Sequence, residues 1–97
     1  MKSIEKKYYW KNGSITTKLI NDVLHRENGP AVEGHDSTHW EFVYNGQSHN
    51  INGPSICWKD GTLFYHIGGE YIGTNLSNAE FKQKVKEFVF KWNGIRL

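Results

Sequence analysis

A phrase of nine residues occurs twice in this chain, as LHRENGPAV at residues 24–32 and as SHNINGPSI at residues 48–56. Its histidine, its Asn-Gly pair and its proline recur at a spacing of 24 residues. A phrase that recurs at a fixed spacing is typical of proteins that stack copies of one structural unit. One unit of this length has room for two short strands and two turns. Between Tyr44 and Gly69 the predicted repeat is one residue longer than 24.

Glycine-containing turn signals divide the chain into short segments. Asn-Gly favours a hairpin turn, because a type I′ turn needs positive φ at both central residues. The segments KYYW, HWEFVY, SICW and TLFYHI between these signals are aromatic or β-branched, which favours strands. The turn signals are Asn12-Gly13, Asn28-Gly29, Asn45-Gly46, Asn52-Gly53, Asp60-Gly61, Gly68-Gly69 and Asn93-Gly94.

The repeated phrase itself predicts a strand end, a tight turn and a strand start. Glycine tolerates the position before proline, and proline suits a turn exit because it lacks an amide donor. Gly29 and Gly53 are therefore expected in turn positions that are poorly open to other residues. We expect an array of two recognisable repeats, with a degenerate repeat before them and another after them.

The chain changes character at Leu76, where LSNAEFKQKVKEFVFKW shows helical spacing. Ser77 and Glu80 match a capping box, and Leu76 and Phe81 match a hydrophobic staple. We expect a helix over residues 77–92, ended by Gly94. One face of this helix is apolar and is expected to pack on the sheet through Phe81, Val85, Phe88, Val89 and Trp92.

These elements predict an α+β fold, an antiparallel β-meander of hairpin repeats with one C-terminal helix on one face. Ninety-seven residues suit a single domain, with the array at 6–73. A single cysteine, Cys57, excludes a disulfide framework and favours a reducing compartment. The N-terminus lacks the apolar region of a signal peptide, and no segment is long enough to span a membrane. We expect a cytoplasmic protein without membrane contact.

The segment from Tyr8 to Gly73 resembles β-hairpin repeat proteins encoded mainly by bacteriophages, which are loosely similar to MORN-repeat variants. The resemblance lies in HRENGPA, HNINGPS, YNG and WKDG, and the helix that follows is similar to the tail of those proteins. It implies a hairpin array, a non-enzymatic role and a host cell as the setting. The second unit has Asn50 where the first has Arg26, so a role that needs two arginines is not expected.

The polar residues do not predict an enzyme. His35 and His39 have a spacing that could bind zinc on a helix, but they lie in a predicted loop and strand, so no metal is expected. His25 and His49 stand at equivalent positions, which predicts a repeated hydrogen bond to a turn carbonyl. Cys57 lacks a predicted base, and no phosphate loop or carboxylate pair occurs. We expect no catalytic residue and no cofactor.

Charge is unevenly distributed along the chain. Residues 1–11 have four lysines and one glutamate, and residues 81–97 have five basic residues and one glutamate. Residues 12–80 have three basic and eight acidic residues. Aromatic sheets can bind nucleic acid, but an acidic sheet repels phosphates, so nucleic acid is not the favoured partner.

Aromatic residues occur on both predicted faces of the sheet, and one helix can cover only one of them. An uncovered aromatic face favours protein binding. The predicted contact residues are Tyr9, Tyr65 and one of Trp40 or Trp58, with Arg26 at the rim. The alternative is that loops and a second copy of the chain close both faces.

The favoured function is binding and inhibition of a host protein, such as a defence factor. Two alternatives remain open. One is a protein that sequesters a signalling nucleotide in a pocket at the interface of a dimer. The other is an antitoxin that neutralises a cognate toxin.

Overall fold

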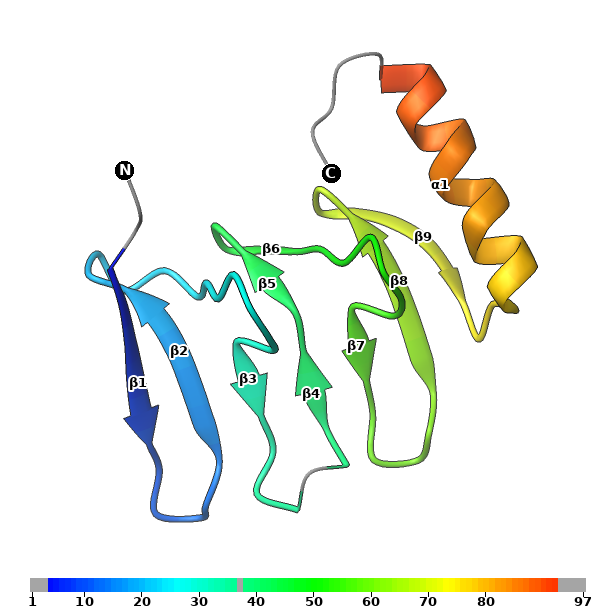
Figure 1. Cartoon of the computed structure of the whole chain (residues 1–97). Coiled ribbons are helices and arrows are strands. Elements are labelled where there is room, and N and C mark those ends of the chain that lie inside the picture. Colours follow the sequence, from blue (N-terminus) through cyan, green and yellow to red (C-terminus); the bar gives the residue numbers. More distant parts are fainter. Residues whose placement is uncertain (1–3, 37, 93–97) are drawn as a thin grey trace.

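A computed structural model describes the backbone of residues 4–36 and 38–92, and side chains as far as residue 88. Seven strands form one antiparallel sheet in the order β1-β2-β3-β4-β7-β8-β9, while β5 and β6 pair with each other (Figure 1). The helix α1 spans Asn78–Trp92. The strands are β1 (Glu5–Tyr9), β2 (Ile15–Leu19), β3 (Val32–Glu33), β4 (Trp40–Glu41), β5 (Val43–Tyr44), β6 (Gln47–Ser48), β7 (Ile56–Cys57), β8 (Leu63–Ile67) and β9 (Glu70–Thr74).

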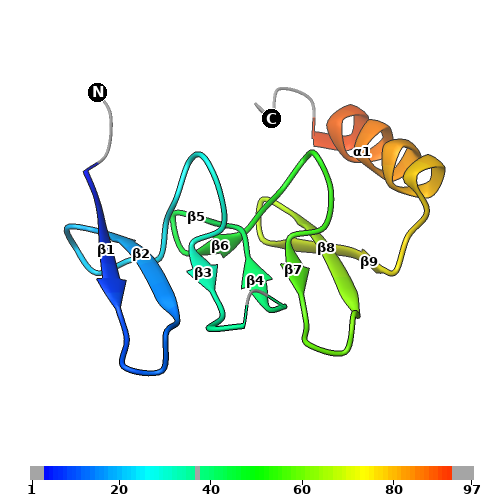
Figure 2. The same ribbon diagram turned by 60° about the horizontal axis from the view of Figure 1, so that its bottom comes forward.

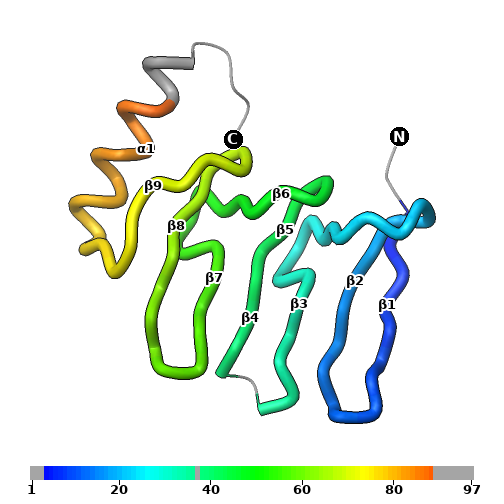
Figure 3. Tube along the Cα trace, turned by 180° about the vertical axis from the view of Figure 1, so that it is seen from behind, coloured from blue at the N-terminus to red at the C-terminus, as the bar shows by residue number. Residues whose placement is uncertain are grey.

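The hairpins β1–β2, β3–β4 and β7–β8 lie side by side, and their tight turns gather at one end of the sheet (Figures 1 and 3). The helix lies at the opposite end of the row from β1, next to β9 (Figure 2). The Cα atoms span 41 × 37 × 16 Å, so the molecule is flat. This arrangement confirms the predicted α+β fold, a meander with one C-terminal helix.

The turn signals separate into hairpin turns and open connections. Asn45-Gly46 and Gly68-Gly69 have positive φ at both residues, as a type I′ turn requires. The turns at Asn12-Gly13 and Asp60-Gly61 are three-residue loops instead, with positive φ at the glycine. The signal Asn93-Gly94 lies outside the described residues.

The expectation of hairpin turns at Asn28-Gly29 and Asn52-Gly53 is wrong. Both pairs form bends in the connections that precede β3 and β7. Arg26 and Asn50 close these bends, because each side chain donates a hydrogen bond to the proline carbonyl four residues later. The prediction for Gly53 fails as well, since its φ is not in the left-handed region and a Cβ there would contact nothing within 4 Å.

Two details of strand pairing also differ from the prediction. A two-residue turn at Asn12-Gly13 predicts Trp10 opposite Ile15 and Tyr8 opposite Thr17, but the first hairpin pairs Tyr9 with Ile15 and Tyr8 with Thr16. Its three-residue loop causes the shift, because the expected two-residue turn would place Trp10 opposite Ile15. The segment HWEFVY is divided, since β4 belongs to the large sheet and β5 pairs with β6.

The histidines of the repeated phrase join each unit to the next. Nδ1 of His25 accepts a hydrogen bond from the amide of Asn45 at 2.9 Å. Nδ1 of His49 accepts the equivalent bond from the amide of Gly68 at 2.8 Å. The predicted repeated hydrogen bond is confirmed, but its partner is a turn amide rather than a turn carbonyl. Each ring therefore fixes the next turn in place.

The helix begins at the predicted cap. The amide of Ser77 donates to the Glu80 carboxylate at 2.8 Å, and the amide of Glu80 donates to the Ser77 hydroxyl at 3.1 Å. Phe81 and Phe88 are buried and Val85 is half-buried. The side chains of Val89 and Trp92, also predicted on this face, lie outside the described residues.

Tyr65 belongs to the core, so its predicted exposure is wrong. The side chain is 5% exposed, and its ring centroid lies 5.0 Å from that of Phe81. Its hydroxyl donates to the carbonyl of Leu76 at 3.1 Å. The helix thus covers the face of β8 that carries Tyr65, where a partner had been expected.

Candidate functional site

Exposed apolar side chains gather on the first strand and on the residues that flank it. Half of the exposed large hydrophobic residues that the structure describes lie within residues 4–10, and Tyr9 is 73% exposed. Tyr8 and Tyr9 alternate between the two faces of β1, and Trp10 follows at the turn. We call this group the edge cluster, and its members are Ile4, Tyr8, Tyr9 and Trp10.

A second aromatic group crosses the sheet on one face. Trp58 stacks on His39 at 4.8 Å between ring centroids, and Phe64 meets Trp58 edge-on at 6.2 Å. Tyr71 continues the row at 6.4 Å from Phe64. The helix contacts the opposite face through Tyr65, so this row is not covered by α1.

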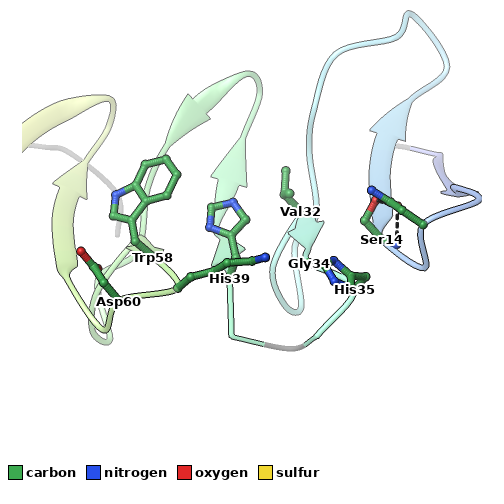
Figure 4. Close-up of a pocket in the computed structure, with 9 residues that line it drawn as sticks. Ser14, Val32, Gly34, His35, His39, Trp58 and Asp60 are labelled. Carbon is green, nitrogen blue, oxygen red and sulfur yellow. Dashed lines mark hydrogen bonds between the residues drawn. The ribbon is translucent and has the colours of Figure 1, made fainter.

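An open hollow lies beside Trp58, at the end of the sheet where the tight turns gather (Figure 4). We call it the turn-end hollow; its volume is about 670 Å³. In Figure 4, Val32 and Gly34 lie between His39 and Ser14. The lining residues are Asn12, Ser14, Val32, Gly34, His35, His39, Trp58, Lys59 and Asp60.

The repeat explains why the turn-end hollow exists. Gly34 stands 24 residues after Trp10 and 24 residues before Trp58, at the equivalent turn position. The loop closed by Gly34 and His39 is one residue longer than the loop closed by Trp58 and Thr62. A Cβ at position 34 would lie 3.1 Å from Cβ of His39. The middle unit therefore lacks the indole that both its neighbours carry.

Both ring nitrogens of His39 face a hydrogen-bond acceptor in this wall. The Cys57 carbonyl can only accept, so Nδ1 of His39 donates to it at 2.9 Å. Nε2 lies 2.9 Å from the carboxylate of Glu41. The carboxylate also can only accept, so a ring with one N–H makes one of these two hydrogen bonds, and a ring with two N–H groups makes both.

Ionised aspartates flank the turn-end hollow. The hydroxyl of Thr38, and to a smaller extent its amide, donates a hydrogen bond to the carboxylate of Asp36. These bonds lower the pKa of that carboxyl to about 2. The amide and hydroxyl of Thr62 likewise lower the pKa of Asp60. Nζ of Lys59 lies 3.5 Å from Oδ2 of Asp36. These carboxylates remain charged across the physiological range.

A second hollow, of about 670 Å³, lies between the two connections that contain the repeated phrase. Arg26 lines it, but Nη1 of this arginine also donates to the Glu33 carboxylate at 3.0 Å. His49 lines it too, and burial lowers the pKa of this histidine. Arg26 is therefore a structural residue as well as a member of this wall.

One cluster has residue types that bind metals. The ligand atoms of Glu5, His25 and Glu27 lie within 4.8 Å of one another. Nδ1 of His25 accepts the Asn45 amide, so the neutral ring carries its proton on Nε2. A metal-bound histidine normally donates through its second nitrogen, and His25 cannot do so. The cluster does not fit a metal.

The five predicted contact residues do not form one surface. Tyr9, Trp40 and Tyr65 follow one face of the sheet, and Trp58 lies on the other. Trp40 is half-buried against Phe42, with ring centroids 5.3 Å apart. Tyr9 and Trp58, which is 41% exposed, are the two that remain open to a partner.

Trp10 and His39 are absent from the predicted set, although Trp10 belongs to the edge cluster and His39 to the aromatic row that crosses the sheet. A signal for Trp10 was available, because it precedes the equivalent Trp58 by two repeat periods. The stacking of His39 depends on a long-range pairing between β4 and β7, which no local pattern reveals.

Comparison with protein-family models, curated proteins and solved structures finds no match to this chain. Within the described residues, no helix has the length and apolar character needed to cross a membrane.

Proposed function

We propose that this chain is a small non-enzymatic protein-binding module that captures another protein through its exposed aromatic side chains. The resemblance to phage repeat proteins suggests the concrete form, which is binding and inhibition of a host protein such as a defence factor. Neutralisation of a cognate toxin is physically the same act, and a toxin gene next to this one would favour it.

The edge cluster carries this proposal. Tyr9 and Trp10 are 73% and 52% exposed, and they follow each other at the end of β1. The indole of Trp10 donates to the Thr16 hydroxyl on the Tyr8 face, whereas Tyr9 lies on the other face, so a partner that binds at the edge itself can meet both. Tyrosine and tryptophan are enriched among the residues that dominate binding energies at interfaces. Burial of such a large aromatic side chain by a partner contributes favourable binding free energy, because it removes apolar surface from water.

The test compares captured proteins between the parent chain and two variants. Tyr9→Ala with Trp10→Ala should lose a partner that the parent binds saturably and inhibits. Ile20→Ala is the matched control, because Ile20 is 77% exposed but lies at a different turn. Thermal melting should show a folded protein in each case. Retention of the partner by the aromatic double variant would contradict the proposal.

The turn-end hollow favours a second candidate, sequestration of a nucleotide. A base could stack near Trp58, and Lys59 could meet a phosphate. Calorimetric titration with common and cyclic nucleotides tests this candidate. The parent chain should release or absorb heat on binding, and Trp58→Leu should not. The charges of Asp36 and Asp60 oppose a phosphate, so protein binding ranks first.

A further inference from the structure

The first strand is an open edge of the sheet. Among the described residues, β1 pairs with β2 on one side and has no strand on the other (Figures 1 and 3). All five of its residues are exposed, and its pairing with β2 shows no register shift. Such an edge is a template for another strand, because half of its backbone groups face outward.

The hydrogen-bond pattern identifies the outward groups. The amide of Trp10 donates to the carbonyl of Ser14, and bonded and non-bonded pairs alternate along an antiparallel ladder. Thr17, which is paired with Lys7, bonds away from β1, to Ala31 and His25. The amide and carbonyl of Lys7 therefore face outward.

By the same alternation, the backbone groups of Glu5 and Tyr9 face outward as well. Those of Lys6 and Tyr8 face β2. The edge thus offers three residues with the two-residue spacing that a pairing strand needs.

The side chains give this edge a positive charge. Lys6, Lys7 and Lys11 are exposed. The only carboxylate on β1 belongs to Glu5, and it turns inward, where it accepts the amide of Glu27 at 2.9 Å. A partner at this edge therefore meets lysines together with the aromatic rings of the edge cluster.

We propose that an extended acidic segment of a partner protein adds to β1 as an eighth strand of the sheet. This inference rests on the proposed protein-binding function and states its mode. Backbone hydrogen bonds supply affinity in such strand addition, and the alternating side chains supply selectivity. Carboxylates of the added strand lie opposite Lys6 and Lys7, and its apolar residues cover Tyr8 and Tyr9.

A second copy of this chain fits the edge poorly. An antiparallel pairing of two β1 strands centred on Lys7 places two lysines directly opposite each other, which is unfavourable. The lysines thus oppose self-association but favour an acidic strand.

The experiment uses a capped peptide of about ten residues in which pairs of glutamate alternate with pairs of valine, so that each face of the added strand carries both residue types. Hydrogen exchange read by NMR reports each amide of β1. The peptide should slow exchange at Glu5, Lys7 and Tyr9, whose amides face outward. The same peptide with lysine in place of glutamate should have no effect. Equal protection by both peptides, or none by the acidic one, would overturn the proposal.

Lys7→Pro separates strand addition from simple charge attraction. It removes an outward amide and no bond to β2, and edge strands tolerate proline at such positions. Affinity for the acidic peptide should fall about tenfold or more, while Lys7→Ala should weaken binding less. Equal affinity of the two variants would overturn strand addition.

Charge reversal provides a second test should proline disrupt the hairpin. Lys6→Glu with Lys7→Glu should reverse the preference, so that the lysine peptide protects the edge and the acidic peptide does not. An unchanged preference would overturn the proposal. Protection of the Lys7 amide by the chain alone at high concentration would assign the edge to a second copy, and protection by an oligothymidine would assign it to nucleic acid.

Failure here is distinguishable from failure of the protein-binding function. A partner that is lost with Tyr9→Ala and Trp10→Ala but retained by Lys7→Pro would leave the function intact and refute the mode.

Discussion

His49 connects two repeat units through one ring nitrogen. Its Nδ1 accepts the amide of Gly68, so the neutral ring is the form that the fold uses. Burial lowers the pKa of His49 below its ordinary value of 6.5. The unfolded chain therefore binds a proton at higher pH than the folded chain does, and His49 stabilises the fold above about pH 6.5.

We expect the chain to lose stability as the pH falls from about 7.5 to about 5. His49→Asn should reduce this loss, because the asparagine oxygen can accept the Gly68 amide without titrating. Urea unfolding midpoints at the two pH values measure the effect. His66, whose pKa is also lowered by burial, accounts for part of the loss that remains. An equal loss in the parent and His49→Asn would refute the role of this ring.

Gly29 and Gly53 occupy equivalent positions in the repeated phrase but differ in their surroundings. Gly29 has φ of 151°, and a Cβ there would lie 2.9 Å from Cζ of Arg26. That guanidinium is held by the Pro30 carbonyl and by Glu33, so it cannot move without losing hydrogen bonds. Gly53 has neither constraint.

Gly29→Ala should therefore cost about 1 kcal/mol or more in the free energy of unfolding. Gly53→Ala should be neutral or stabilise the fold by up to about 1 kcal/mol, because alanine restricts the unfolded chain. Chemical denaturation of the two variants measures both. Equal destabilisation would show that the two bends obey the same constraint.

At the scale of the elements, the helix contributes apolar surface at the end of the sheet. Phe81 is 7% exposed and packs on Tyr65. Phe81→Ala should destabilise the chain by about 3–5 kcal/mol, since truncation of a buried phenylalanine leaves a cavity. Lys82→Ala, at the next and exposed residue, is the matched control and should change little. A thermal midpoint unaffected by Phe81→Ala would show that the helix does not support the sheet.

The helix and its cap could be predicted because their signals are local. Ser77 and Glu80 are three residues apart, and the apolar spacing that follows fits one face of a helix. The type I′ turn at Asn45-Gly46 is equally local. These features depend on neighbours in the sequence and not on the rest of the fold.

The remaining features depend on contacts between distant residues. The expected strand HWEFVY is divided because Val43 turns away to pair with Ser48, while the amide of Phe42 still donates to Ser55. Asn28-Gly29 has the composition of a hairpin turn, yet Arg26 holds it as a bend through the Pro30 carbonyl. Periodicity could show that Tyr65 alternates with Phe64, but only the position of the helix decides which of them is buried.

At the scale of the whole molecule, the core is unevenly distributed. In the described part of the chain, Ala31 is the only buried apolar residue before Val43. The buried side chains nearer the N-terminus, Thr17 and His25, are polar. In an array of repeats each unit is stabilised mainly by its immediate neighbours. The β1–β2 end is therefore expected to open more readily than the end that carries the helix.

Native-state hydrogen exchange can test this gradient at matched amides. The amide of Thr17 donates to Ala31 at 2.7 Å, and the equivalent amide of Phe42 donates to Ser55 at 2.6 Å. Since the two bonds have nearly the same length and the same place in the repeat, a difference in exchange reports the stability of the surrounding unit rather than the bond. We expect Thr17 to exchange faster than Phe42. Equal protection of the two amides would instead mean that the sheet and helix unfold as one cooperative unit.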